Sequence, residues 1–77
     1  MKITKIEYTK SQIEFTIDSQ TILGEIKVNF WRDTGSVHFS SFTSPEHESI
    51  IGKWIREQTG SIKRFSDSKI EEFIKSL

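Results

Sequence analysis

The tripeptide Asp33-Thr34-Gly35 is the segment of this sequence that most directly suggests catalysis, because aspartic proteases carry the same three residues. Such a protease needs two of these aspartates, which share one proton at the ends of apolar strands. Trp31 and Arg32 come directly before Asp33, and a cation beside a carboxylate holds it ionised. Asp and Gly are also frequent turn residues. We therefore interpret the tripeptide as the turn of a β-hairpin.

The two histidines do not form a metal-binding pattern. His47-Glu48 begins like the zinc-protease helix motif, but the residue four positions after His47 is Ile51 rather than a second histidine. His38 falls in a predicted strand. The sequence has no cysteine, which excludes a disulfide scaffold, a thiol nucleophile and the usual zinc ribbons. We therefore predict no metal site and no cofactor.

Other catalytic arrangements are also missing from the sequence. The four glycines, at positions 24, 35, 52 and 60, are too dispersed to form a phosphate-binding loop. No serine stands in the glycine-flanked pattern of a hydrolase nucleophile. Glu71 and Glu72 are neighbours in a predicted helix, so their side chains point about 100° apart and do not form a catalytic pair. The sequence therefore predicts a protein that is not an enzyme.

The length and the charge of the chain exclude further classes of protein. The chain has 77 residues, enough for a single domain at 1–77, and its 11 basic and 11 acidic residues cancel. Zero net charge argues against both a strongly electropositive nucleic-acid binder and a polyanionic mimic. No apolar run has the length of a signal-peptide core or a membrane span. We therefore expect a cytoplasmic protein without membrane contact.

The N-terminal half alternates between apolar and polar residues, as half-buried strands do. The clearest example is segment 12–18, in which Ile13, Phe15 and Ile17 are apolar and the residues between them are polar. The same pattern predicts four strands, at about residues 2–8, 12–18, 22–32 and 36–42. Short polar turns connect them, so we expect a four-stranded antiparallel β-meander.

Two registers are open for the hairpin of the third and fourth strands. A two-residue turn pairs Phe30 with Phe39. A four-residue turn instead pairs Phe30 with Val37, and Asn29 with His38. Both registers keep the apolar side chains of the two strands on one face, so the pattern does not choose between them.

The C-terminal third changes to helical spacing. Ser44 and Pro45 are typical of a helix start, Gly60 of a helix end, and Ser66 of a second start. The predicted helices cover about residues 45–59 and 67–76. Their apolar stripes are Ile50, Ile51, Trp54 and Ile55 in the first helix, and Ile70, Phe73, Ile74 and Leu77 in the second. The fold class is therefore α+β, with at least the first helix packed on one sheet face.

The outer face of the predicted sheet is the first candidate binding surface. Lys27, Trp31 and His38 face outward if the apolar residues of their strands face the helices. Phe42 lies at the end of the fourth predicted strand. Exposed aromatic residues dominate protein interfaces and also stack on nucleic-acid bases. This surface requires that neither segment 61–65, a candidate for an extra edge strand, nor the second helix covers it.

Basic residues form the second candidate surface, in and after the first predicted helix. They are Lys53, Arg56, Lys63 and Arg64. Together with Glu57 they give the segment 53–64 a charge of +3, four positive residues minus one negative. Such a cluster can contact phosphates or an acidic protein. Because the whole chain is neutral, we favour a solvated or protein-contacting surface over a dedicated nucleic-acid site.

A hairpin that runs directly into a helix occupies residues 26–55. Its distinctive residues are Val28-Asn29 in the strand, and Glu48-Ser49-Ile50-Ile51 and Lys53-Trp54-Ile55 in the helix. With these residues, the segment resembles part of the small phage-encoded anti-CRISPR proteins. The resemblance implies a small inhibitor that blocks a nuclease by occupying its DNA-binding surface. It covers less than half of the chain and assigns no site residues.

Together these features predict a small non-catalytic protein-binding module, an inhibitor or accessory factor such as a phage or mobile element encodes. The alternative is a weak single-stranded nucleic-acid-binding protein that uses the outer sheet face and the basic cluster. A protein is therefore the favoured partner and nucleic acid the second. The chain itself is expected to be a monomer or, through its outer sheet face, a homodimer.

Overall fold

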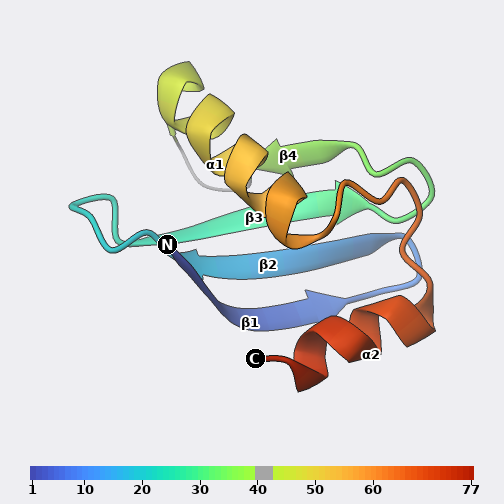
Figure 1. The fold of residues 1–77 in the computed structure, drawn as a ribbon. Helices are drawn as coiled ribbons and strands as arrows, with labels where there is room; N and C mark the ends of the chain where they lie inside the picture. Colours follow the sequence, from blue (N-terminus) through green and yellow to red (C-terminus); the bar gives the residue numbers. More distant parts are fainter. Residues whose placement is uncertain (40–42) are drawn as a thin grey trace.

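A computed structural model describes residues 1–39 and 43–77 and shows a four-stranded antiparallel sheet followed by two helices (Figure 1). The strands, in order across the sheet, are β1 (Lys2–Tyr8), β2 (Gln12–Asp18), β3 (Glu25–Trp31) and β4 (Val37–Phe39). The helices are α1 (Pro45–Gln58) and α2 (Asp67–Lys75). The predicted α+β fold, a β-meander followed by two helices, is confirmed.

The third strand covers Glu25–Trp31, so the prediction that it begins at Ile22 is wrong, and it ends one residue before its predicted end. Gln20 and Gly24 have positive φ angles of 60° and 68°, which do not occur within a regular strand. The main-chain N–H of Ser19 donates to the carbonyl oxygen of Gly24 at 3.0 Å. A closed turn therefore replaces the first three predicted strand residues and carries Ile22.

The hairpin of β3 and β4 adopts the register with a four-residue turn. Phe30 pairs with Val37, and Asn29 pairs with His38. The fourth strand starts at Val37, one residue later than predicted, and its predicted residues 40–42 lie outside the described part of the chain. The register places the side chains of Trp31 and His38 on the same face of the sheet, because the faces alternate along each strand.

Serine caps start both helices, as the sequence predicts. The Ser44 hydroxyl accepts a hydrogen bond from the main-chain N–H of His47 at 3.3 Å, and Ser66 accepts one from Lys69 at 3.2 Å. These bonds satisfy N–H groups that have no partner within the first helical turn. Each helix ends one residue before its predicted end.

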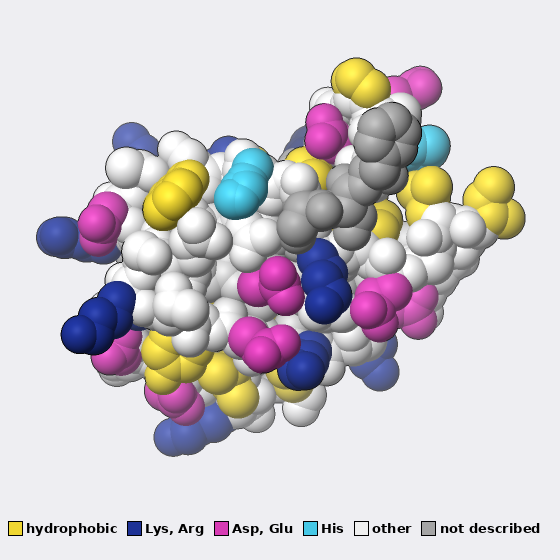
Figure 2. All heavy atoms as spheres, turned by 180° about the vertical axis from the view of Figure 1, so that it is seen from behind, with side chains coloured by type: hydrophobic (Ala, Val, Ile, Leu, Met, Phe, Trp, Pro, Cys, Tyr) yellow, Lys and Arg dark blue, Asp and Glu magenta, His cyan; other side chains and the backbone are white. Residues whose placement is uncertain are grey.

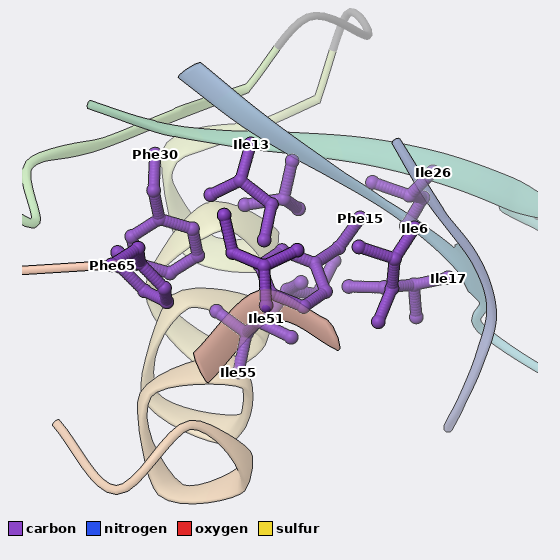
Figure 3. Close-up of a cluster of buried hydrophobic side chains, with 11 residues drawn as sticks. Ile6, Ile13, Phe15, Ile17, Ile26, Phe30, Ile51, Ile55 and Phe65 are labelled. Carbon is purple, nitrogen blue, oxygen red and sulfur yellow. The ribbon is translucent and has the colours of Figure 1, made fainter. Parts of the chain in front are cut away.

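Both helices pack on the same face of the sheet and share one core. Figure 3 shows side chains from the sheet and from α1 that point toward one another. The buried cluster consists of Ile6, Ile13, Phe15, Ile17, Ile26, Val28, Phe30, Ile51, Ile55, Phe65 and Ile70. Within it, the rings of Phe15 and Phe30 meet edge to face, with centroids 5.6 Å apart. The opposite face of the sheet, the outer face, carries neither helix (Figure 1).

Two residues of the predicted helical stripes are not part of this core. Ile50 is 57% exposed and Leu77 is 56% exposed. Ile50 lies about 100° around the helix from Ile51, which is buried, so it points away from the sheet. Leu77 follows the last turn of α2. The apolar stripe of each helix is therefore wider than the part that the sheet covers.

Segment 61–65, a candidate for an extra edge strand, is a loop in the structure. The main-chain N–H of Phe65 donates to the carbonyl oxygen of Arg32 at 2.9 Å, and the Phe65 ring is buried in the core. The loop therefore lies against the end of β3. Trp31 is 45% exposed, so neither this loop nor α2 covers it.

Arg32 joins three separate parts of the fold. Its guanidinium donates through Nε to the carbonyl oxygen of Phe65 at 2.9 Å and through Nη1 to that of Thr9 at 2.7 Å. Nη2 forms an ion pair with the carboxylate of Asp67. Arg32 therefore forms its ion pair with Asp67, at the start of α2, rather than with Asp33, its neighbour in the sequence.

Candidate functional site

The tripeptide Asp33-Thr34-Gly35 lies in the turn between β3 and β4, as predicted. Gly35 has a φ of 72°, and its N–H donates to the carbonyl oxygen of Trp31 at 2.8 Å. Across residues 1–39 and 43–77, no group of three or more His, Asp or Glu side chains gathers where it could hold a metal ion. Neither α1 nor α2 combines the length and apolar character that a membrane crossing needs.

Trp31 and His38 lie together on the outer face of the sheet. Their ring centroids are 6.3 Å apart, and the planes are tilted by 45°. Lys27 is on the same face but four residues from Trp31 along β3, which corresponds to about 13 Å. Phe42, the fourth predicted member of this surface, lies outside the described residues. The structure thus brings together Trp31 and His38, with Lys27 at a distance.

Charged side chains of both signs cover the middle of this outer face (Figure 2). Lys5 pairs with Glu7 at 3.2 Å, and Lys27 pairs with Glu14 at 3.8 Å. Glu7 and Glu14 stand directly opposite each other on neighbouring strands, a like-charge contact that the two lysines offset. This part of the outer face is therefore a balanced set of charges rather than a basic surface.

The predicted basic cluster belongs to a different layer of the molecule. All four of its residues are exposed: Lys53, Arg56, Lys63 and Arg64. Lys53 and Arg56 lie on α1, which packs on the inner face of the sheet, whereas Trp31 and His38 lie on the outer face. A nucleic-acid strand that contacted both predicted surfaces would therefore have to pass around an edge of the sheet.

A second apolar surface, larger than the one at Trp31 and His38, lies beside α1. The sequence does not predict it. Among the described residues, the exposed large hydrophobic side chains are Met1, Tyr8, Ile22, Leu23, Trp31, Ile50 and Leu77. Two adjoining hollows are lined by four of these side chains, Met1, Leu23, Ile50 and Leu77. Ile22 is the direct neighbour of Leu23 in the same turn. Exposed apolar side chains that gather in this way mark interaction surfaces.

The first hollow, which we call the inter-helix groove, measures about 320 Å³ and lies between α1, α2 and the start of β1. Its larger apolar walls are Ile3, Trp54, Phe73 and Leu77. Ile3, Trp54 and Phe73 are partly buried because they also pack against the core. Lys2, Gln58 and Ser76 add polar groups to its walls. The groove is thus a mostly apolar hollow with a polar border.

The second hollow, which we call the turn hollow, measures about 200 Å³ and lies between the β2–β3 turn and the first half of α1. Its apolar walls are Met1, Leu23, Ile50 and Ile51. Met1 lines both hollows, so they adjoin. On α1 the two hollows share one side of the helix, because Ile50 and Trp54 are four residues apart.

Two features of the sequence agree with this surface. Gly24 follows Ile22-Leu23 directly and favours a turn there, because glycine adopts positive φ without strain. Ile50 and Ile51 are adjacent in a helix, and their side chains point about 100° apart, so only one of them needs to face the sheet. Nothing in the spacing alone, however, indicates which apolar residues stay uncovered.

A hydrogen bond between Tyr8 and Glu71 joins β1 to α2, which forms one wall of the groove. The Tyr8 hydroxyl donates to Oε1 of Glu71 at 2.7 Å. This bond, together with the nearby negative charges of Glu71 and Asp67, raises the pKa of Tyr8, because a phenolate would face carboxylates. The guanidinium of Arg32, 5.5 Å from the centre of the Tyr8 ring, acts in the opposite direction.

Comparisons of this chain with protein-family models, with curated proteins and with solved structures found no match. The resemblance of residues 26–55 to anti-CRISPR proteins therefore stays a prediction.

Proposed function

We propose that this chain is a small non-catalytic protein-binding module, an inhibitor or accessory factor, that holds its partner in the inter-helix groove. One observation supports this proposal above the others. The groove places the partly exposed Trp54 and Phe73 beside Leu77, which is 56% exposed, around an apolar hollow of about 320 Å³. A partner that fills the hollow removes these surfaces from water, which contributes about 25 cal/mol for each Å² of apolar area buried.

The residue types of the groove fit protein recognition. Tryptophan is enriched among the residues that dominate interface energies, and such residues lie in hollows surrounded by polar groups. Trp54 has this position, with Gln58 and Ser76 nearby in the same hollow. Trp54 and Phe73 also pack against the core, so their rings are already ordered before a partner arrives. An ordered surface loses little entropy on binding.

The alternative, a weak single-stranded nucleic-acid binder, has less support from the geometry. It depends on Trp31 and Lys27 acting with the basic cluster, and these lie in different layers. Lys27 also pairs with Glu14 at 3.8 Å, which offsets its charge. Nucleic-acid affinity rests largely on phosphate contacts with unopposed cations. We therefore place protein binding first.

The test is affinity capture from a nuclease-treated lysate of the cells that naturally make the protein, read by mass spectrometry. The Leu77→Glu variant places a charge at the mouth of the groove, and its exposed site leaves the core unchanged. Ser68→Glu is the matched control, because it adds the same charge to an exposed position on α2 that does not line the groove.

We expect the native chain and Ser68→Glu to retain the same protein, and Leu77→Glu to lose it. Equal retention by all three chains would exclude the groove as the binding surface. Recovery that depends on intact nucleic acid would instead favour the alternative function.

A further inference from the structure

Ile22 is an apolar residue in the position where proteins usually place a polar one. It lies in the β2–β3 turn and is fully exposed, at 104% of its reference surface. Turn positions of this kind usually hold Gly, Asn, Asp or Ser. A large β-branched side chain that is fully exposed keeps all of its apolar surface in water, which is unfavourable unless something covers it.

Hydrogen bonds inside the turn hold Ile22 in this projecting position. The Ser19 hydroxyl donates to the carbonyl oxygen of Gly24 at 2.7 Å, and the N–H of Gly24 donates to that of Thr21 at 3.0 Å. The N–H of Leu23 donates to the Thr21 hydroxyl oxygen at 3.2 Å. The residues on both sides of Ile22 are therefore fixed, and the side chain is a defined projection.

The turn hollow lies directly beside this projection. Leu23, the next residue in the turn, forms one of its walls, and Ile50, 57% exposed, forms another. The hollow measures about 200 Å³, and its walls are largely apolar. A projection and a hollow of matching chemistry therefore occur side by side on one surface. In Figure 2, hydrophobic side chains stand out at the end of the molecule that carries this turn.

We propose that this surface pairs two copies of the chain in a two-fold dimer, with Ile22 of each copy seated in the turn hollow of the other. A two-fold interface uses the same patch on both subunits, so that patch must contain both the projecting group and the site that receives it. The patch of Ile22, Leu23 and Ile50 meets this requirement. Among the described residues that line the inter-helix groove, the most exposed large apolar side chain is that of Leu77, at 56% against 104% for Ile22.

The net charge of the chain is also compatible with a second copy as the partner. The chain has no net charge, so two copies do not repel each other at long range. Glu46 lies in the first turn of α1, and the next residue, His47, lines the hollow. Charge therefore does not oppose the pairing of two copies.

The size of the patch sets the expected affinity. A stable interface of standard size buries about 800 Å² on each partner. That is a large share of the 5118 Å² that this chain exposes, and the patch is only part of one end of the molecule. We therefore expect a reversible dimer with micromolar or weaker affinity, separate from partner binding in the groove.

Sedimentation equilibrium from micromolar to millimolar concentration tests this proposal. The native chain is expected to shift from monomer to dimer over this range. Ile22→Asp should weaken the dimer by about tenfold or more, because the carboxylate would lose its hydration in an apolar hollow. Ser68→Asp, with the same charge change on α2, should dimerise like the native chain, as should the groove variant Leu77→Glu.

The results of these and related measurements either overturn or support the proposed dimer. A native chain that stays monomeric at millimolar concentration excludes the dimer. A dimer that Ile22→Asp leaves unchanged, while circular dichroism shows the fold intact, excludes this surface. Methyl contacts between the Ile22 of one labelled copy and the Ile50 of an unlabelled copy, measured by filtered NMR, would support it. Contacts at Trp31 and His38 instead would place the dimer on the outer sheet face. Loss of partner capture by Leu77→Glu has no bearing on these results.

Discussion

The Nε atom of Arg32 donates a hydrogen bond to the carbonyl oxygen of Phe65 at 2.9 Å, and the N–H of Phe65 donates to the carbonyl oxygen of Arg32 at 2.9 Å. The two residues are 33 positions apart in the sequence. Their reciprocal bonds hold the loop before α2 against the end of β3. Because α2 forms one wall of the inter-helix groove, this pair of residues helps to set the shape of the proposed binding surface.

Replacing Arg32 with alanine is expected to lower the free energy of unfolding by about 2–3 kcal/mol. Arg32 is buried, and its removal leaves the carbonyl oxygens of Phe65 and Thr9 without their partner. Urea unfolding followed by circular dichroism measures the change. Arg64→Ala, at an exposed position in the same loop, is the control and should change stability by less than about 0.5 kcal/mol. Equal stability of the two variants would contradict this role of Arg32.

The hydrogen bond from Tyr8 to Glu71 is expected to make stability fall at alkaline pH. The pKa of Tyr8 in the folded chain is raised above its ordinary value of 10.0, so folding favours the neutral phenol. The contribution is therefore fully present below pH 10 and is lost as the pH rises through the folded-state pKa. Tyr8→Phe removes this dependence, and the difference between the native and variant stability curves against pH isolates it.

Tyr8 is the chain's single tyrosine, so its ionisation can be measured directly by phenolate absorbance. The folded native chain should titrate above pH 10.0. Glu71→Gln should lower the pKa of Tyr8 toward its ordinary value, because a neutral amide replaces the carboxylate. An unshifted titration in the native chain would show that the Tyr8–Glu71 bond is not formed in solution.

Trp31→Ala is expected to leave the fold intact. The ring is 45% exposed on the face of the sheet that carries neither helix, so its loss should cost less than about 1 kcal/mol. Phe65→Ala is the contrasting variant, because Phe65 is 2% exposed in the core and its loss should cost about 3–5 kcal/mol. Urea unfolding measures both. A large loss for Trp31→Ala would mean that the outer face packs against another part of the chain.

The same Trp31→Ala variant also separates the two candidate binding surfaces. It should retain any partner that Leu77→Glu loses, because the groove and the outer face lie on different sides of the sheet. Loss of the partner in Trp31→Ala, with the fold intact, would move the binding site to the outer face.

The elements of this fold are predictable from the sequence because their signals are local. Alternation in residues 12–18 defines a strand with its buried face, and Ser44 and Ser66 define helix starts. The sequence leaves the register of the β3–β4 hairpin open, since both registers bury the same residues. The turn geometry that decided it depends on which residues satisfy the main-chain bonds of the turn, and alternation carries no information on that.

The surfaces are less predictable, because burial depends on contacts between distant segments. Apolar spacing places Ile50 and Leu77 in the helical stripes, yet both are exposed, because the sheet covers only part of each stripe. Arg32 gave no signal of its structural role, since its partners Thr9 and Phe65 are distant in sequence. The exposure of Trp31 likewise depended on where the loop before α2 lies.

Gly35 and Gly24 provide a matched test of how closely that loop is held. Both have positive φ, 72° and 68°, so alanine is strained at either position. A β-carbon on Gly35 would lie 2.9 Å from the carbonyl oxygen of Ile62 and 3.0 Å from Cα of Lys63. A β-carbon on Gly24 would meet no heavy atom within 4 Å.

Gly24→Ala should therefore cost about 1 kcal/mol, which is the backbone strain alone. Gly35→Ala should cost about 2 kcal/mol or more, because the backbone of Ile62 and Lys63 must also move away from the turn. Urea unfolding of the two variants gives the difference, which measures how firmly the loop packs on the β3–β4 turn.

If the loop is displaced, Phe65 leaves its place beside Arg32 and the wall formed by α2 shifts with it. Gly35→Ala should then also weaken partner capture by the inter-helix groove, whereas Gly24→Ala should not. Equal costs in the two variants would show that the loop is not held against the turn.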